Sequence, residues 1–384
     1  MLIRVEKLVY GGSGLARTDD GVIFVPGTIP GELVDTEIVN RKNDYSHARV
    51  TGIIEPSEDR REPLCPNFET VGCCDWSHIT YERQLLLKEE ILLESLARLA
   101  KIEWRNKIPC VYGPELEYRL RASFHVSKQV LGFMRAGTKD LVPINSCSAL
   151  MSELNQFVAD ASDLMSDPCF DGTEAINVIA SPENGKVTAA FLRGLESARW
   201  NELDPTTTVS GIEFRLNPNS FFQPNRFLLE HITSLILEEV GLPNLTLDLF
   251  CGSGFFSLPL AKYSSRLVGI DRRSVRIARW NARHNEIKNV EFIKASAGEF
   301  LSKSDLQPDF VLLDPPRTGA GTKVIMRLAR LRPDRIVYVS CNPTTFAPEA
   351  RLLLDSGYRL VSIKFIDQFP NTHHIETVAL FQRA

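Results

Sequence analysis

The sequence predicts an α/β protein whose carboxy-terminal part is a doubly wound, Rossmann-like domain with a seven-stranded sheet. From about residue 245, continuous apolar runs alternate with helix-like segments, which is typical of a parallel sheet covered on both faces. Polar motifs follow several of these runs, and such sheets bind ligands beyond the carboxyl ends of their strands. The expected strands are LTLDLF, RLVGID, VEFIKA, DFVLLDPP, RIVYVSCNP, YRLVSIKFID and ETVALFQ.

The length of 384 residues exceeds that of one ordinary domain. We expect a small β-barrel over residues 1–56, an α+β domain over residues 57–225 and the doubly wound domain over residues 226–384. A hydrophobic content of 43% and a charged content of 24% are typical of soluble globular proteins. Because the sequence opens with no signal-peptide pattern and has no apolar run long enough to span a bilayer, we expect a cytoplasmic protein.

The amino-terminal part alternates apolar and polar residues in short runs separated by Gly, Asp and Pro turns, which is typical of a small β-barrel. Barrels of the oligonucleotide-binding type often hold nucleic acid, but a purely structural barrel fits the pattern equally well. The runs are LIRVEKLVY, GVIFVPG, ELVDTEIVN and HARVTGIIE.

The middle part begins with a polar, Pro-containing linker over residues 56–66, which leads to the cysteine cluster CPNFETVGCCDW. A helix is expected over residues 81 to about 101, and strand-like runs then mix with helix-like ones. Eight cysteines in a chain expected in the cytosol favour metal binding or catalysis over a disulfide framework. The strand-like runs are RASFHVS, VLGFMRA, INVIAS and KVTAAFLR.

The charge balance counts against a dedicated nucleic-acid binder, because 44 Lys+Arg and 48 Asp+Glu give a net charge of -4. A basic run is present at Arg272-Arg273, Arg276 and Arg279. This run is compatible with a locally positive cleft, but we interpret it as a solvated helix face.

The first strand of the carboxy-terminal part runs into a tight glycine loop, Cys251-Gly252-Ser253-Gly254, where backbone can approach a ligand closely. Asp271 ends the next strand, where an acidic side chain can hold ribose hydroxyls. A dinucleotide fingerprint would place Gly at the position of Ser257, so the pattern favours an adenosine without phosphates. The alternative is a plain strand-to-helix turn with Asp271 as a helix cap.

Three further motifs fall at ends of the expected strands. Asp314 opens DPPR, where two prolines stiffen the backbone. Cys341 in SCNP stands at the mouth of the sheet, where a thiol can act as a nucleophile, although a buried and inert Cys is the alternative. The segment HHIET brings Glu376 to the same mouth as a candidate general base. Its adjacent histidines would point opposite ways on a strand, which argues against a shared metal.

These residues resemble a known family, the bacterial and archaeal RNA 5-methyluridine methyltransferases. The nearest resemblance is to the TRAM-domain, iron-sulfur-containing 23S rRNA uracil-5 methyltransferases. The resemblance implies S-adenosylmethionine as cofactor, RNA as partner, Cys341 as nucleophile and Glu376 as base. It also implies cofactor and substrate contacts at Gln223, Phe250, Gly252, Asp271 and Asp314. The motifs that carry it are GFMRAGTKDLVPINSC, NSFFQPN, DLFCGSG, GID, DPPRTG, SCNP and HHIET.

The implied reaction explains why these residue types are needed. Carbon 5 of uracil is a poor nucleophile, so a thiolate from Cys341 first adds to carbon 6 and creates an enolate that takes the methyl group. Glu376 then removes the proton from carbon 5, which lets the thiolate leave. Asp314 is expected to stabilise the base by hydrogen bonding. Phe221 and Phe222 are expected to stack on a uracil that is flipped out or lies in a loop.

The cysteine cluster departs from the family pattern of Cys, five residues and Cys-Gly-Gly-Cys, with a fourth Cys far downstream. Here Val71 replaces the second Cys and Cys73 replaces the second Gly. We expect a [4Fe-4S] cluster on four thiolates, with zinc or a lost site as alternatives. The expected ligands are Cys65, Cys73, Cys74 and Cys147.

Competing functions remain at this point. An RNA-binding protein that lost activity would not need SCNP and HHIET, and an exocyclic-amine methyltransferase would not need a Cys nucleophile. A cytosine-5 methyltransferase shares the mechanism, so only the family resemblance favours uracil. The amino-terminal barrel favours 23S ribosomal RNA over transfer RNA by analogy.

Overall fold

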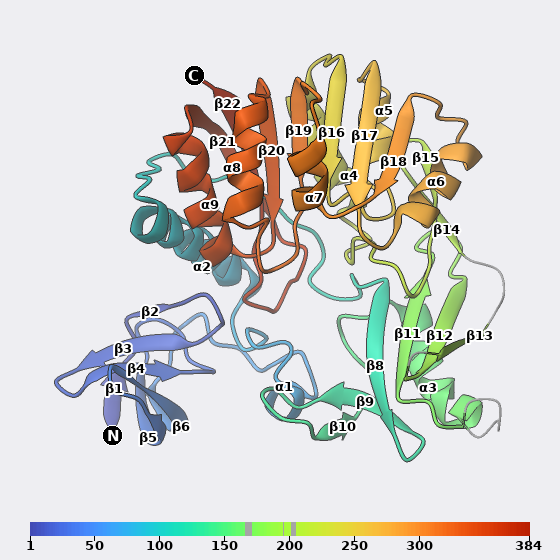
Figure 1. Cartoon of the computed structure of the whole chain (residues 1–384). Coiled ribbons are helices and arrows are strands. Elements are labelled where there is room, and N and C mark those ends of the chain that lie inside the picture. The colour runs from blue at the N-terminus through green and yellow to red at the C-terminus, as the bar shows by residue number, and fades with distance from the viewer. Residues whose placement is uncertain (166–170, 195, 201–204) are drawn as a thin grey trace.

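The protein is described by a computed structural model that covers residues 1–165, 171–194, 196–200 and 205–384. Its strands form an amino-terminal β unit, a central α+β unit and a carboxy-terminal α/β unit (Figure 1). The predicted α/β fold class is confirmed. Within the described residues, no helix is both long enough and apolar enough to cross a membrane.

The amino-terminal unit is a curved sheet with strand order β1-β5-β6-β4-β3-β2. Its small core is built from the alternating apolar side chains that the sequence pattern indicated, Ile3, Val5, Ala16, Ile23, Val25, Val34 and Ala48. The strands are β1 (Leu2–Arg4), β2 (Lys7–Leu8), β3 (Gly14–Thr18), β4 (Gly21–Val25), β5 (Leu33–Arg41) and β6 (Tyr45–Glu55).

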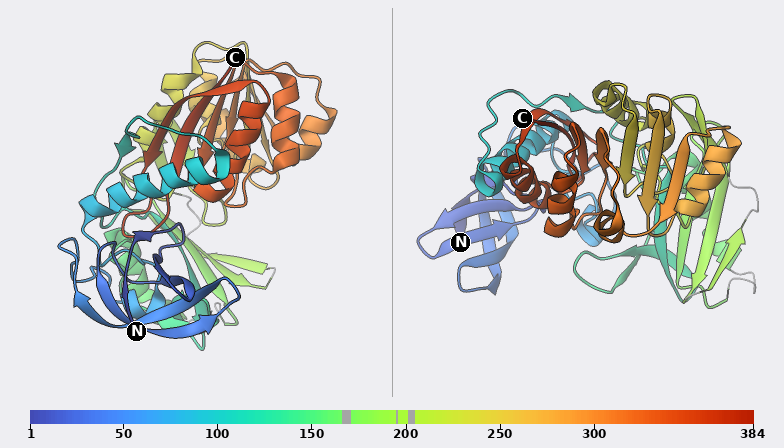
Figure 2. Two further views of the ribbon diagram at one scale, coloured as in Figure 1. Left: turned by 90° about the vertical axis from the view of Figure 1, so that its left-hand side faces the viewer. Right: turned by 45° about the horizontal axis from the view of Figure 1, so that its top comes forward.

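The linker to the next unit is irregular, as expected, and is held to the amino-terminal unit by an ion pair. Arg60 binds the fully buried carboxylate of Glu32 through Nε at 2.6 Å. After α1 (Phe68–Val71), the predicted long helix forms as α2 (Tyr81–Ser95) and continues as a π-helical turn, Leu96–Ala100. Figure 2 shows this helix lying against the carboxy-terminal unit, where it packs on α9 (Pro343–Asp355).

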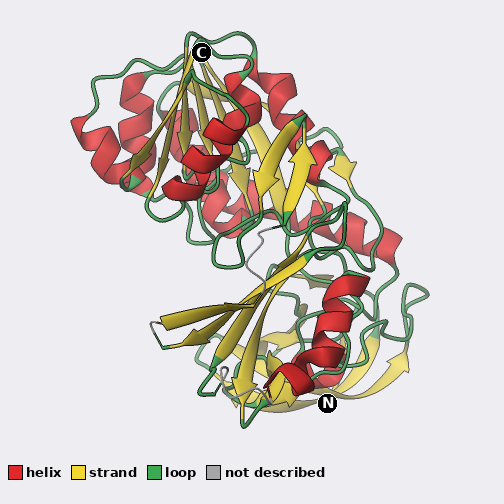
Figure 3. Cartoon of the chain, turned by 90° about the vertical axis from the view of Figure 1, so that its right-hand side faces the viewer, coloured by secondary structure: helices red, strands yellow, loops and turns green. Residues whose placement is uncertain are grey.

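The central unit is an antiparallel sheet with strand order β10-β9-β8-β11-β12-β13. Helix α3 (Ser152–Met165) packs on its strands, as Figure 3 shows. A separate hairpin, β14 (Thr206–Val209) and β15 (Ile212–Arg215), then leads toward the carboxy-terminal unit. The strands of the sheet are β8 (Arg121–Ser127), β9 (Val130–Met134), β10 (Leu141–Pro143), β11 (Ala175–Ala180), β12 (Val187–Arg193) and β13 (Glu196–Trp200).

The carboxy-terminal sheet has the strand order β18-β17-β16-β19-β20-β22-β21-β7. The expected apolar runs form β16 (Leu245–Leu249), β17 (Arg266–Asp271), β18 (Val290–Lys294), β19 (Phe310–Leu313), β20 (Arg335–Ser340), β21 (Tyr358–Ile366) and β22 (Glu376–Arg383). The helices are α4 (Leu229–Val240), α5 (Ser257–Ala261), α6 (Val275–His284), α7 (Ala297–Lys303), α8 (Thr322–Leu331) and α9.

This sheet differs from the prediction in two ways. A two-residue strand from the central part, β7 (Cys110–Val111), pairs with β21 and adds an eighth strand among the described residues. Moreover, β22 runs antiparallel between β20 and β21, because a loop and not a helix joins it to β21.

The antiparallel direction of β22 brings Glu376, its first residue, to the carboxyl edge of the parallel strands. Ser340 at the end of β20 pairs with Thr377 of β22, and Glu376 lies next to Thr377. In Figure 1 the carboxyl ends of the parallel strands point toward the amino-terminal and central units. The predicted site residues therefore gather where all three units approach one another.

Candidate active site

The loop after β16 has the strained geometry of a ligand-binding loop. Phe250, Gly252 and Gly254 have positive φ angles of 75°, 53° and 83°. The amides of Phe250 and Cys251 both donate to the carbonyl oxygen of Ile270, at 2.9 and 3.0 Å. A positive φ is costly for a residue with a Cβ, and such residues cluster at functional sites. A Cβ at Gly252 would meet no described atom within 4 Å, so a ligand has room over the loop.

Asp271 serves as a turn acceptor at the end of β17. Its Oδ1 accepts hydrogen bonds from the amides of Arg273 at 2.7 Å and Ser274 at 2.8 Å, at the start of α6. These bonds close the turn before α6, whose N-cap is Ser274, so Asp271 does not cap that helix. They use only one carboxylate oxygen and fix its orientation at the carboxyl edge of the sheet. The second oxygen is compatible with a contact to a ribose hydroxyl.

Asp248 lies beneath the glycine loop and is fully buried. Its Oδ2 accepts a hydrogen bond from the hydroxyl of Ser257 at 2.5 Å, and its Oδ1 has no hydrogen-bond partner among the described residues. Burial, together with the nearby charge of Asp271, raises the pKa of Asp248 to about 7.

The segment NSFFQPN places its two aromatic side chains differently. Phe222 is 2% exposed and packs edge-on against Phe255 at 5.1 Å, so its predicted stacking on a substrate base is wrong. Phe221 is 54% exposed and lies under the guanidinium of Arg121 at 5.5 Å. Gln223 is buried at 4% exposure. The sequence pattern could not show which of the two phenylalanines is buried, because the turn directs the ring of Phe222 into the core and that of Phe221 outward.

Cys341 follows the last residue of β20 and is half-buried. Burial raises the pKa of its thiol to about 12, with further contributions from Glu376 and Asp314, whereas the charge of Arg317 opposes the shift. The thiol is therefore protonated in the free protein near neutral pH. Its carbonyl oxygen accepts a hydrogen bond from the hydroxyl of Tyr10 at 3.1 Å.

Glu376 and Asp314 form a coupled pair of carboxyl groups beside the thiol. Burial raises the pKa of Glu376, and the charge of Asp314 raises it further, whereas Arg317 lowers it. Burial and the charge of Asp248 raise the pKa of Asp314 to about 8. Because the charge of Asp314 disfavours ionisation of Glu376, the two carboxyl groups do not readily both ionise, and the site holds a proton that a reaction can move.

The loops that carry these groups are tied together by Asn342. Its side chain caps α9 by accepting from the amide of Thr344 at 2.9 Å and donates to the carbonyl oxygen of Arg317 at 3.0 Å. The amide of Gly321, further along the same loop, donates to the buried carboxylate of Glu349 at 2.7 Å. Arg317 belongs to the DPPR motif, whose pattern indicates no role for it, because its charge acts on Cys341 and Glu376 only once the fold brings the three residues together.

The two adjacent histidines lie in the loop before β22 and not on the strand, so the strand argument against a shared metal does not apply. Their rings are 4.3 Å apart, but they bind different partners. His373 Nδ1 lies 2.6 Å from Asp75 Oδ2, and His374 Nε2 lies 3.0 Å from a guanidinium nitrogen of Arg317. Burial lowers the pKa of His374 to about 3, so its ring is neutral.

The predicted cysteine ligands lie near one another. The sulfurs of Cys73 and Cys74 are 3.9 Å apart, and a hydrogen bond with Cys74 lowers the pKa of Cys65 to about 7. Cys147 is buried, which raises its pKa, and the charges of Cys73 and Cys65 raise it further. Within the described part of the chain, however, no group of three or more Cys, His, Asp or Glu side chains has the arrangement of a metal site.

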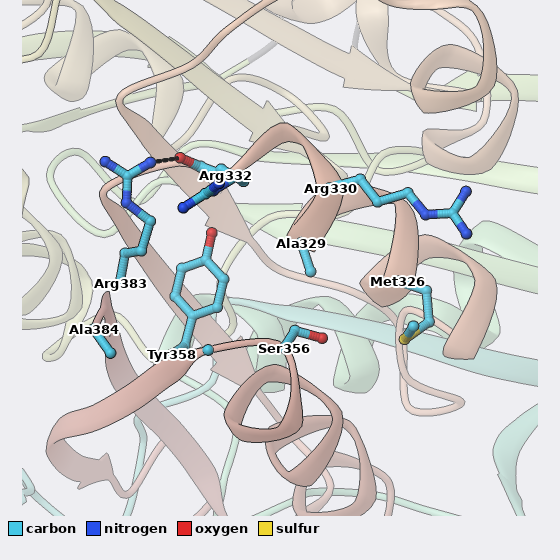
Figure 4. Close-up of a pocket in the computed structure, with 9 residues that line it drawn as sticks. Met326, Ala329, Arg330, Arg332, Ser356, Tyr358, Arg383 and Ala384 are labelled. Carbon is cyan, nitrogen blue, oxygen red and sulfur yellow. Dashed lines mark hydrogen bonds between the residues drawn. The ribbon is translucent and has the colours of Figure 1, made fainter.

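A separate pocket lies at the opposite edge of the sheet (Figure 4). It is lined at the carboxy-terminal ends of α8 and α9 by Arg330, Arg332 and Tyr358, among others. Arg383 closes one side by donating to the carbonyl oxygen of Arg332 at 2.8 Å and pairing with Asp334. Because it lies at the amino end of β20, this pocket does not include the predicted site residues.

Two family descriptions match parts of the chain. The family described as tRNA (Uracil-5-)-methyltransferase matches residues 204–384, and the TRAM domain matches residues 1–51. A protein of Aquifex aeolicus named "Uncharacterized RNA methyltransferase" is 32% identical, over 99% of this chain and 98% of that protein. The "23S rRNA (uracil(1939)-C(5))-methyltransferase RlmD" of Shewanella sediminis is 31% identical, over 99% of this chain and 95% of that protein.

A solved structure shares the fold over nearly the whole chain. It is the Pyrococcus abyssi tRNA (uracil-54, C5)-methyltransferase in complex with S-adenosyl-L-homocysteine. The TM-score is 0.76 at 23% sequence identity, with 99% of this chain and 100% of that chain covered. This likeness supports the arrangement of the three units.

Proposed function

Because the chain belongs to the RNA (uracil-5-)-methyltransferase family, we propose that it methylates carbon 5 of a uridine in 23S ribosomal RNA, through a covalent bond from Cys341 to carbon 6. The observation that carries the proposal is the grouping of a thiol and two coupled carboxyl groups at one edge of the sheet. A methyltransferase that acts on an exocyclic amine has no use for that thiol.

S-adenosylmethionine supplies the methyl group as a sulfonium, and residues at the carboxyl edge of the sheet would hold it. The loop around Phe250 and Gly252 would receive the adenosine, and Asp271 would accept from the ribose hydroxyls through the oxygen that does not bind the turn before α6. Gln223 and Asp314 are the remaining candidates for contacts to cofactor and substrate. The absence of a phosphate-binding Gly at Ser257 agrees with a cofactor that has no phosphate.

The thiol and the carboxyl groups divide the reaction into an addition and an elimination. In the addition, the thiol of Cys341 gives its proton to water and its sulfur bonds to carbon 6, which makes an enolate. Carbon 5 of that enolate then takes the methyl group from the sulfonium, which leaves S-adenosylhomocysteine. In the elimination, the carboxylate of Glu376 accepts the proton from carbon 5, the sulfur–carbon 6 bond breaks and the thiolate leaves. Arg317 favours the ionised forms of both Cys341 and Glu376.

The first experiment compares wild type with Cys341→Ala on labelled S-adenosylmethionine and RNA from cells that lack the enzyme. We expect 5-methyluridine with wild type and none with the variant. Methyl transfer by Cys341→Ala at the wild-type rate would overturn the covalent mechanism. RNA containing 5-fluorouridine should in addition trap wild type as a stable adduct, because fluorine at carbon 5 cannot leave as a proton.

The choice of ribosomal over transfer RNA is supported by the curated relative's name and by the amino-terminal TRAM unit. A competition assay tests this choice: the enzyme is given equal amounts of 23S ribosomal RNA and transfer RNA, each lacking 5-methyluridine, and methylation of each RNA is measured. We expect methylation of the ribosomal RNA, and preferential methylation of transfer RNA would overturn this part of the proposal. A ribosomal substrate also implies a cytoplasmic enzyme, which cell fractionation tests.

We also propose that a [4Fe-4S] cluster is held by Cys65, Cys73, Cys74 and Cys147. Cys73 would take the place of the ligand Cys that the family has at the position of Val71. Contact between the thiols of Cys73 and Cys74, and between those of Cys65 and Cys74, supports a common site. The loop would have to adjust for all four thiolates to bind one cluster, because the described side chains are not arranged as a metal site. Four thiolates are the usual complement of such a cluster, and methyl transfer uses no electrons, so its role would be structural.

Iron and sulfide content after anaerobic purification tests this assignment without an activity assay. We expect about four irons per chain in wild type and a marked loss in Cys73→Ser, while Cys110→Ser on β7 serves as the matched control. Zinc in place of iron, or full iron content in Cys73→Ser, would show that the assignment is wrong.

A further inference from the structure

Two segments from the amino-terminal half of the chain contact the residues that carry the reactive groups. The first is the loop between β2 and β3, where the hydroxyl of Tyr10 donates to the carbonyl oxygen of Cys341 at 3.1 Å. Ser340 is the last residue of β20 in the ladder with β22, so this carbonyl lies just beyond the sheet. Tyr10 thus anchors the main chain at the residue that carries the thiol.

The second segment follows the cysteine cluster. Asp75 makes two contacts with His373: its Oδ2 lies 2.6 Å from the ring Nδ1, and its Oδ1 accepts the backbone amide at 3.2 Å. The amide of Trp76 donates to the carbonyl oxygen of Asn371 at 3.1 Å. These bonds fix the end of the loop that leads into β22, three residues before Glu376.

The two contacts belong to one packed junction. The ring of Tyr10 meets the ring of His373 edge-on at 5.4 Å, and the indole of Trp76 donates to the carbonyl oxygen of Gly12 at 3.3 Å. Gly12 approaches so closely that a Cβ there would lie 2.0 Å from Asp75 Oδ2. The two segments are therefore packed against each other, while each makes its own hydrogen bonds, Tyr10 to Cys341 and Asp75 to His373.

We propose that Tyr10 and Asp75 are positioning residues for the reaction: Tyr10 places the sulfur of Cys341, and Asp75, acting through His373, places the carboxyl group of Glu376. The proposal rests on the roles assigned to Cys341 and Glu376 above. Displacements of about 1 Å can cost a hundredfold in rate when reacting groups must meet in one geometry. Neither residue needs to touch the substrate to have this effect.

The two residues should act on different steps, which a merely structural role would not produce. Tyr10→Phe removes one hydrogen bond and keeps the ring. We expect it to slow adduct formation with 5-fluorouridine RNA by about threefold to tenfold, the effect of about 1 kcal/mol. Elimination from ordinary uridine RNA should keep its wild-type rate.

Asp75→Asn keeps the shape of the side chain but replaces an acceptor beside His373 with a donor. We expect normal trapping by 5-fluorouridine RNA but slower elimination, by about threefold to tenfold. A denaturant-stable complex of protein and methylated ordinary RNA should then accumulate. Tyr263→Phe and Asp19→Asn are exposed control substitutions and should change neither step.

The outcomes separate this inference from the proposed function. If wild type gives no adduct with 5-fluorouridine RNA, the covalent mechanism itself fails. If wild type is trapped but both variants match it in both steps, the positioning roles fail. If each variant slows both steps equally and also lowers the melting temperature, the junction only holds the units together, which would likewise overturn the proposal.

Discussion

At the scale of single residues, Cys341 combines its proposed nucleophilic role with an environment that keeps it protonated. Burial raises the pKa of its thiol to about 12, and Glu376 and Asp314 add to the shift. Such a thiol reacts slowly with solution reagents. The enzyme is thereby protected from alkylation and oxidation until a substrate changes the site.

This environment predicts the pH dependence of alkylation at Cys341. Because only the thiolate reacts, the rate with iodoacetamide should rise about tenfold per pH unit and should not level off by pH 9, whereas an ordinary thiol with a pKa of about 8.5 levels off there. Arg317→Met should slow the reaction at pH 8, because Arg317 lowers the pKa of the thiol. Mass spectrometry of the peptide with Cys341 gives the rate, and a plateau below pH 8 would contradict the expectation.

Asp248 predicts a second pH effect, on stability. Its folded pKa is raised to about 7 from about 3.9, so the stability gained by retaining the proton is complete below about pH 4 and is lost as the pH rises through 7. Asp248→Asn should therefore melt about 2–4 °C above wild type at pH 8 and show a smaller gain at pH 5. Thermal melts across this range test it, with Asp19→Asn as an exposed control. A gain that shrinks as the pH rises would rule out this cause.

At this scale, the sequence predicted which candidate residues share one edge of the sheet. Cys341, Asp314 and Glu376 directly follow or open strands, so the strand order brings their positions together. Tyr10 and Asp75 could not be predicted, since 331 and 298 residues separate them from Cys341 and His373. No local pattern encodes contacts across such distances. The sequence also could not predict that Phe221 is exposed and Phe222 buried, because this difference depends on one turn of irregular backbone.

At the scale of elements, the loop between β21 and β22 is held by a buried ion pair. Lys88 of α2 binds Asp367 at 2.6 Å, both side chains are fully buried, and Lys88 also donates to the carbonyl oxygen of Phe369 at 3.1 Å. Gln84, one helical turn earlier, donates to Asn371 Oδ1 at 3.0 Å. Helix α2 therefore fixes the loop that delivers Glu376.

Breaking this pair should destabilise the protein strongly. Lys88→Met leaves the charge of Asp367 buried without its partner, which costs about 3–5 kcal/mol. Chemical denaturation measures the loss, and Arg105→Met, in an exposed pair with Glu103, should cost less than about 1 kcal/mol. Restoration of stability in the double variant Lys88→Met/Asp367→Leu would support the cause, and an equal loss for Lys88→Met and Arg105→Met would contradict it.

The pattern of apolar runs was sufficient for the long strands and for the helix that begins at Tyr81, because their periodicity extends over many residues. It missed β7, since a strand of two residues has no periodicity. It also did not show that β22 runs antiparallel. That direction depends on whether a helix or a loop precedes the strand, and the loop here is fixed by α2 and by Asp75, not by its own residues.

At the scale of the whole molecule, the amino-terminal unit contacts the carboxyl edge of the α/β sheet, and Gly12 of this unit lies close to Asp75. Gly12→Ala should displace either this unit or the carboxylate of Asp75 from His373, because the new Cβ would lie 2.0 Å from Asp75 Oδ2. We expect at least a tenfold loss of methylation with the strands of each unit retained. Activity and circular dichroism together measure this.

Gly11→Ala is the matched control. Gly11 also has a positive φ, of 105°, but a Cβ there would meet no described atom within 4 Å. Both variants therefore carry similar backbone strain, and only one of them displaces a neighbour. Equal losses in the two variants would show that strain, and not docking, is the cause.

The place of β22 between β20 and β21 also has a consequence for the biosynthesis of the protein. The ribosome makes Cys341 before Glu376, and until β22 emerges the sheet has a gap between two strands already made. A nascent chain at that stage has the nucleophile but not the proton acceptor. An adduct formed at that stage would not be released. The gap beside β20, however, also leaves the end of that strand without its neighbour, so the thiol is not yet held in place. Late insertion of an interior strand therefore delays both steps of the reaction until the chain is nearly finished.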